Sequence, residues 1–128
     1  MLLFANDTLK ADYFDKLSNS VVHILADIVD KLSRDKMRAV VTSVMRTKEK
    51  QEAICKEMGM PYYASLHEYG HAVDFVTDPL CPSAYALSLC EEINKEYPYR
   101  GKKKTVSLIW HQGTGLTKHF HLQTAIEN

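Results

Sequence analysis

The apolar residues near the beginning of the chain constrain the fold most strongly, because they recur every three or four positions over a long segment. Between Thr8 and Ser33 the series comprises Tyr13, Leu17, Val21, Ile24, Ile28 and Leu32. This spacing is typical of an amphipathic helix with one apolar face, and Asn6 and Asp7 are suitable N-cap residues. Such a face must be buried, so we expect the rest of the chain to provide the surface that covers it.

The rest of the chain alternates short segments rich in β-branched residues with further helical patterns. The expected strands lie at 37–44, at 73–76 after a loop that begins at Tyr62, at 105–111 and at 119–125. The expected helices run from Lys48 to Met58, with Gly59 as the C-cap, and from Asp78-Pro79 and Pro82 to about Lys95. This order predicts an α+β fold, in which helices pack on one small, mainly antiparallel sheet.

Length and charge narrow the class of protein. A chain of 128 residues suits a single domain, 1–128. Its 16 Lys and Arg balance 16 Asp and Glu, which gives no electrostatic reason to expect nucleic acid as a partner. We expect a monomer made in the cytoplasm, with neither a signal peptide nor an integral membrane segment. The cysteines, Cys55, Cys81 and Cys90, are odd in number and form no C-x-x-C pair, so we expect reduced thiols.

Residues with metal-binding side chains are densest between Ser65 and Asp74. One interpretation is the zincin helix H-E-x-x-H, in which His67 and His71 bind zinc and Glu68 is the base. A glycine inside this motif and β-branched residues after it weaken the helix that the motif requires. The other interpretation takes His67 and Asp74 as the ligands, seven positions apart.

Three motifs in order resemble one known family. Ser-x-His-x-x-Gly-x-Ala-x-Asp at 65–74 resembles the signature of the zinc D-Ala-D-Ala carboxypeptidases and L-Ala-D-Glu endopeptidases. Ser43-Val-Met-Arg46-Thr47 with Gln51 is similar to the upstream element of these enzymes, and His119-Phe-His121 to their carboxy-terminal strand. The superfamily also includes lysostaphin-type enzymes and the amino-terminal domain of Sonic hedgehog, so the resemblance implies a hedgehog/DD-peptidase-like zinc fold.

The resemblance also implies a site. Its metal is Zn²⁺, held by His67, Asp74 and His121 with an open position for water. His119 would be a catalytic or oxyanion-stabilising residue. Arg46 would bind substrate and stabilise developing charge, and Ser65 would support the ligand loop. Gln51 matches the upstream element, and we expect His111 to lie at the pocket or its rim.

The two strand histidines can be assigned in two ways. Residues two apart on a strand point to the same side, so His119 and His121 share a face while Phe120 packs on the other. Relatives with a single histidine carry an acid three residues before the ligand. Here those positions hold Leu116 and Lys118, which favours His121 as ligand and leaves the general base open.

These expectations lead to three hypotheses about function. The first is a zinc peptidase that cuts peptidoglycan stem peptides next to a D-amino acid, as an endo- or carboxypeptidase, and that acts on the cell wall as a phage or prophage lysin. The second is a zinc-binding module of the same fold with weak or no turnover, which the missing acid motivates. The third is the zincin-type protease.

Overall fold

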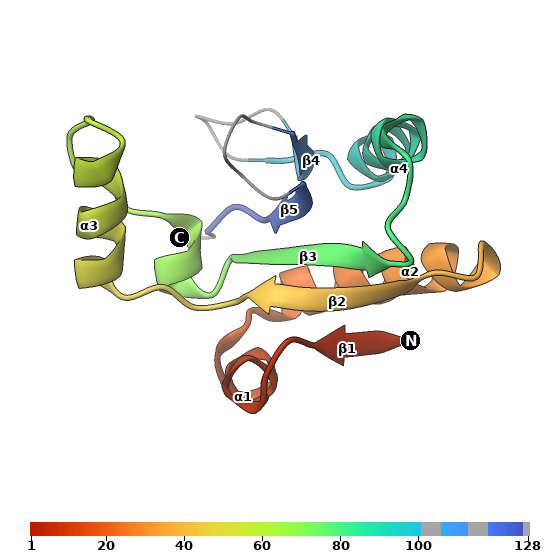
Figure 1. Cartoon of the computed structure of the whole chain (residues 1–128), viewed down its shortest axis with the longest axis horizontal. Helices are drawn as coiled ribbons and strands as arrows, with labels where there is room; N and C mark the ends of the chain where they lie inside the picture. The colour runs from red at the N-terminus through yellow and green to blue at the C-terminus, as the bar shows by residue number, and fades with distance from the viewer. Residues whose placement is uncertain (101–105, 113–117, 127–128) are drawn as a thin grey trace.

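The computed structural model describes residues 1–100, 106–112 and 118–126. Along the chain, the elements are β1 (Leu2–Phe4), α1 (Asp7–Lys16), α2 (Asn19–Arg34), β2 (Arg38–Ser43), α3 (Lys48–Glu57), the 3₁₀ helix η1 (Leu66–Tyr69), β3 (Ala72–Asp78), α4 (Ser83–Glu96), β4 (Leu108–His111) and β5 (His119–Gln123). Figure 1 shows the helices arranged around one sheet. The predicted α+β class is confirmed.

The sheet has the strand order β1-β2-β3-β5-β4. β1 pairs with β2 in parallel, whereas the other three pairings are antiparallel. The predicted, mainly antiparallel sheet is therefore present, with one parallel edge strand. The register between β2 and β3 shifts between Val41 and Ser43, so that Ser43 lies opposite Asp74. This irregularity is a β-bulge at the end of β2, from which the chain continues to α3.

The hydrophobic core lies between the sheet and the helices α2 and α4. Alternate residues of the central strands face this core, and the rings of Phe75 and Phe120 stack there with centroids 4.9 Å apart. The helices contribute the apolar residues that the sequence pattern predicted and several more: Val21, Ile24, Leu25, Ile28, Leu32, Ala86, Leu89 and Ile93. Because strand side chains alternate, the other residues of β3, β4 and β5 are left for the opposite face.

The prediction of a single helix from Thr8 to Ser33 is wrong, because the structure has two helices there. Leu17 is extended, and the side chain of Ser18 caps α2 by accepting a hydrogen bond from the Val21 N–H. The Ser18 N–H also donates to the Gly70 carbonyl at 2.9 Å. Both helices keep their apolar residues in the core, so the three- and four-residue spacing continues across a break that it does not reveal.

Other boundaries differ from expectation in smaller ways. The apolar start of the chain forms β1, which the pattern did not predict. The strand expected around 73–76 spans Ala72–Asp78. The helix expected to start at Asp78-Pro79 and Pro82 is α4, which begins at Ser83. Gly59 follows α3 with φ +70°, as a left-handed C-cap requires. Thr105, the first residue of the strand expected at 105–111, lies outside the described residues.

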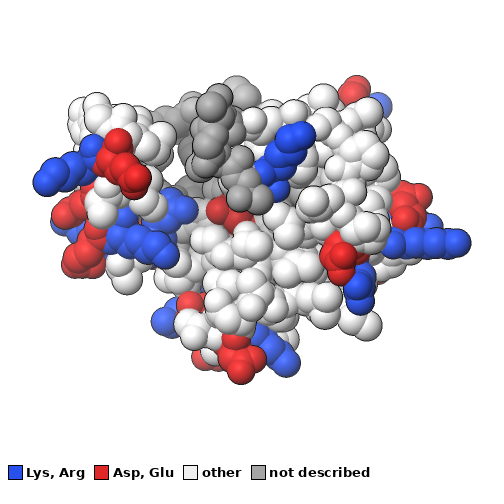
Figure 2. Space-filling view, viewed as in Figure 1, with Lys and Arg blue, Asp and Glu red and all other residues white. Residues whose placement is uncertain are grey.

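The outer surface carries mixed charge. On the face shown in Figure 2, basic and acidic side chains alternate, including over α3. Surface ion pairs such as Lys31 with Glu92 at 2.8 Å join opposite charges. Among the described helices, none combines the length and the apolar character needed to cross a membrane.

Gly70 is the backbone position on which we expect the fold to be most sensitive. It adopts φ +73°, and a Cβ there would collide with the Lys16 carbonyl oxygen at the end of α1. We predict that Gly70→Ala lowers the free energy of unfolding by more than about 3 kcal/mol, because left-handed strain adds to overpacking. Chemical denaturation measures the change.

Gly59→Ala is the matched control for this substitution. Gly59 has φ +70°, but a Cβ there would meet nothing within 4 Å. Only the conformational penalty of about 1 kcal/mol then applies. Equal destabilisation by the two substitutions would contradict the close contact between Gly70 and α1.

Candidate metal centre

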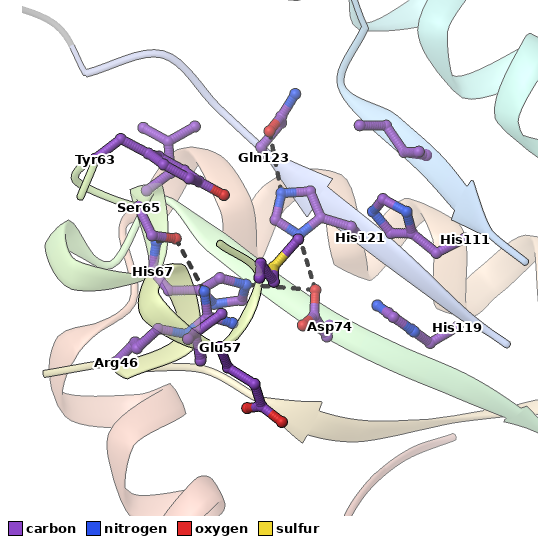
Figure 3. A pocket seen from close by; sticks show the side chains of 14 residues that line it. Arg46, Glu57, Tyr63, Ser65, His67, Asp74, His111, His119, His121 and Gln123 are labelled. Carbon is purple, nitrogen blue, oxygen red and sulfur yellow. Dashed lines mark hydrogen bonds and ion pairs between the residues drawn. The ribbon is translucent and has the colours of Figure 1, made fainter. Parts of the chain in front are cut away.

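Three side chains from three different elements converge on one point. They are His67 of η1, Asp74 of β3 and His121 of β5, and one ligand atom from each lies within 4.8 Å of the others. Asp74 and His121 are directly opposite each other in the antiparallel register of β3 and β5. They therefore project from the same face of the sheet, on the side opposite Phe75 and Phe120. Figure 3 shows His67 approaching from the side.

The contacts within this cluster are short. His121 Nδ1 lies 2.8 Å from Asp74 Oδ1, and His67 Nε2 lies 3.4 Å from the same oxygen. The two imidazole rings have centroids 5.2 Å apart. His67 is buried, with an exposed fraction of 1%. The cluster thus offers two nitrogens and one carboxylate oxygen, a donor set typical of zinc.

The imidazole of His67 is oriented by the backbone. Its Nδ1 lies 3.0 Å from the Val44 carbonyl oxygen, just after the bulge in β2. A carbonyl can only accept, so Nδ1 carries the proton and donates. The remaining nitrogen, Nε2, faces the cluster with its lone pair and has no hydrogen-bond partner among the described residues, although it is buried. A buried acceptor without a donor is costly, and a cation at the centre of the cluster would satisfy it.

The imidazole of His121 is oriented by a glutamine. Gln123 Nε2 donates to the Val106 carbonyl at 2.8 Å, which turns the Gln123 Oε1 toward His121 Nε2 at 3.0 Å. His121 Nε2 must then donate, which leaves Nδ1 facing Asp74 Oδ1. In its neutral form His121 would present the Nδ1 lone pair to a metal ion, whereas in its protonated form it donates this N–H to Asp74. The residues therefore fit a metal ion, with Nε2 of His67 and Nδ1 of His121 as the ligand atoms.

Asp74 remains ionised in this setting. Burial alone would raise the pKa of its carboxyl group, but the adjacent imidazoles of His121 and His67 favour the charged form, outweigh burial and hold the pKa well below its usual range. An ionised carboxylate is the form that binds a metal ion. The site therefore supplies one negative charge toward a bound cation.

The cluster lies in a pocket of about 620 Å³. Predicted site residues Arg46, Ser65, His111 and His119 line it together with the three candidate ligands. Gln51, predicted to bind substrate or to support the residues that do, does not line the pocket. It is fully buried, and its Oε1 accepts a 2.8 Å hydrogen bond from Arg46 Nη1.

Arg46 and Ser65 are tied to the ligand segment. Arg46 Nη1 lies 3.4 Å from Ser65 Oγ, and its backbone N–H donates to the His67 carbonyl at 3.3 Å. Ser65 Oγ also accepts from the His67 N–H at 3.2 Å, as the N-cap of η1. These bonds place the guanidinium at the edge of the pocket beside the buried ligand, as Figure 3 shows.

His111 and His119 form a cross-strand pair next to the cluster. They are opposite each other in the register of β4 and β5, with ring centroids 5.0 Å apart. Burial lowers the pKa of His111, and the nearby His119 and His121 lower it further. His119 shares the face of His121, while Phe120 between them is in the core, as the alternation predicted.

The zincin arrangement is not present. η1 is a single turn that ends at Gly70 in the left-handed region, so no helix continues to His71. His71 Nδ1 instead lies 3.0 Å from Thr124 Oγ1, and His71 is outside the metal-binding group. Of the two positions considered for an acidic base, Leu116 lies outside the described residues and Lys118 is exposed.

Several residues of the site were missed by sequence reasoning. Gln123 lies two positions after His121, so strand alternation placed it on the same face, and this signal was available. Val44 acts through its carbonyl group, which leaves no mark in the sequence. Glu57 and Tyr63 line the pocket from α3 and from the loop before η1. Their places depend on a loop geometry that no local pattern specifies.

Comparison of the chain with models of protein families, with curated proteins and with solved structures finds no match.

Removing the hydrogen bond between His121 Nε2 and Gln123 Oε1 tests the orientation of His121. We predict that Gln123→Leu lowers metal affinity by about 10–100-fold, because His121 Nε2 loses its acceptor and the ring is no longer fixed. A competition titration with a chromogenic chelator measures the affinity. Unchanged affinity in a folded variant would mean that His121 does not bind through Nδ1.

The metal affinity should also depend on pH. Imidazoles bind metal only when neutral, and they generally gain a proton near pH 6.5. Asp74 stays ionised because its pKa is lowered. We therefore predict that metal affinity falls as the pH is lowered, because protons compete with the metal ion for imidazole ligands. The same titration at a series of pH values checks this. A loss of affinity only near pH 4, with none at pH 5–6, would assign the competing protons to carboxylates.

Proposed function

We propose that this protein is a zinc-dependent peptidase that hydrolyses peptidoglycan stem peptides at a bond next to a D-amino acid. The observation that carries the proposal is the orientation of His67 and His121. Their outward nitrogens are bonded to the Val44 carbonyl and to Gln123, so that their inward nitrogens meet the Asp74 carboxylate in an open pocket. Three protein ligands and an accessible fourth position are typical of catalytic rather than structural zinc sites.

Zinc is the metal that this donor set favours. Two imidazoles and one carboxylate form the ligand set of several zinc hydrolases. When bound, zinc would lower the pKa of a coordinated water and polarise a substrate carbonyl. The chain itself would supply the pocket, the orientation of the substrate and the groups that move protons.

Arg46 and His119 are the residues that we assign to the reaction. The Arg46 guanidinium is held by Gln51 and Ser65, so it is placed to bind a carbonyl or carboxylate of the substrate and to stabilise negative charge that develops there. His119 lies two residues before His121 on the same face, within the pocket. It would accept or donate the proton, or stabilise the oxyanion, next to the metal ligands.

The choice of peptidoglycan is supported by the sequence motifs. Their three parts meet at one site: Arg46 and Ser65 beside His67, and Asp74 opposite His121. The resemblance to D-Ala-D-Ala carboxypeptidases and L-Ala-D-Glu endopeptidases therefore supports the family, its fold and the stem peptide as substrate. We further propose that the enzyme acts on the cell wall as a phage or prophage lysin.

Digestion of purified cell-wall sacculi tests this function. We expect stem-peptide fragments to be released by the zinc-loaded protein, to be absent after treatment with a chelator and to reappear when zinc is restored. Mass spectrometry of the fragments identifies the bond. If zinc-loaded protein releases no fragment from any stem peptide, the proposal is wrong.

Substitution of the two strand histidines separates their roles. We predict that His121→Ala loses both zinc and activity, as should His67→Ala and Asp74→Ala. His119→Ala should retain zinc but lose about 10²–10⁴ in rate, because only proton transfer or oxyanion stabilisation is removed. Bound zinc by elemental analysis and fragment release are the two measurements.

The control for these substitutions is His23→Ala. His23 is exposed on α2, and its ring packs against Tyr97 rather than in the pocket. It should keep both zinc and activity. Loss of zinc in His119→Ala but not in His121→Ala would reverse the two assignments.

A zinc-binding module without turnover is the second candidate. The observation that favours it is Lys118, which stands three residues before His121 where single-histidine relatives carry an acid, and which is exposed. Stoichiometric zinc bound to the wild-type protein, without cleavage of sacculi or of model D-alanyl peptides, would favour this candidate.

A further inference from the structure

The pocket contains a second pair of metal-binding side chains. His111 and His119 face each other across β4 and β5, and both line the pocket that holds the first cluster. They are not part of the group formed by His67, Asp74 and His121. Directly opposed side chains on neighbouring antiparallel strands lie on one face of the sheet, so the two imidazoles lie side by side in the pocket.

The separation of the two rings matches that of a shared ion. Two imidazoles bound to one tetrahedral ion at about 2.0–2.1 Å have ring centroids roughly 5 Å apart. The rings of His111 and His119 are 5.0 Å apart. The rings of His67 and His121, in the first cluster, are 5.2 Å apart. The second pair thus has nearly the spacing of the first.

We propose that His111 and His119 form a second metal site, which binds a second zinc ion more weakly than the first cluster does. Imidazole suits zinc, and waters would complete the coordination. Two neutral ligands without a carboxylate bind less tightly than the three ligands around Asp74. Repulsion from an ion in the first site lowers the affinity further.

The second pair lies directly beside the first cluster. The ring centroid of His111 is 6.0 Å from that of His121, and His119 is two residues before His121 on β5. A second ion would act on the reaction by occupying His119. In the proposed peptidase, on which this consequence alone rests, excess zinc removes the group that handles the proton and lowers turnover.

Calorimetric titration of the zinc-loaded protein with zinc chloride tests the site. Protein carrying one zinc, freed of excess metal, should bind one further zinc per chain. Loss of an outer-shell partner alone costs 10–100-fold in metal affinity, so His111→Gln should weaken the second binding by more than about 100-fold. It should keep the first zinc, which also shows that the variant is folded.

His23→Gln is the matched control, since His23 is exposed on α2 outside the pocket. It should leave both binding events unchanged. The inference is overturned if wild-type protein binds no second zinc, if His111→Gln retains the second event, or if His23→Gln abolishes it.

The sacculus assay at increasing zinc concentration separates this inference from the proposed function. The rate should fall with a midpoint that matches the calorimetric dissociation constant of the second site. Fragment release that continues unchanged while the second site fills would overturn the inhibitory role. Cleavage by a protein that binds only one zinc would overturn the second site and leave the proposed function standing.

Discussion

The burial of one ionised carboxylate determines how this end of the molecule is built. Asp74 lies in β3, the central strand of the sheet. An ionised group buried there must be matched by positive charge or by hydrogen-bond donors. The two imidazoles that surround it each have their outward nitrogen bonded to a fixed acceptor, the Val44 carbonyl or Gln123. The outer bonds therefore fix both rings around Asp74, which is the arrangement of a preorganised metal site.

The support of His67 depends on a contact between parts of the chain that are distant in sequence. η1 is short, and one turn of 3₁₀ helix has little stability of its own. It is held because the Gly70 carbonyl accepts from Ser18 at the break between α1 and α2, and because the carbonyl of His71 accepts from the Thr124 N–H. The hydrogen bond between Ser18 and Gly70 therefore links the break between α1 and α2 to the position of His67.

The sequence predicted the parts of the structure that follow from local periodicity. The alternation in β5 placed His119 and His121 on one face and Phe120 in the core, and the spacing of apolar residues identified the helix face that covers the sheet. It did not reveal the break at Ser18, because the helical spacing continues through it. Nor did it decide whether Gln51 lines the pocket or bonds to Arg46, since this depends on how α3 is oriented.

His67 is hydrogen-bonded to the Val44 carbonyl, and His121 lies opposite Asp74 in the sheet. This arrangement has a consequence for how the protein folds. The site draws on β2, η1, β3 and β5, and β5 comes last in the chain yet pairs in the interior of the sheet. The set of three ligands cannot be complete until this strand, which carries His121, is inserted between β3 and β4. A bound ion would therefore oppose global rather than local unfolding, since an ion that binds only the folded state stabilises it by mass action. Slowed hydrogen exchange throughout the sheet, rather than near the pocket alone, would be the signature of this coupling.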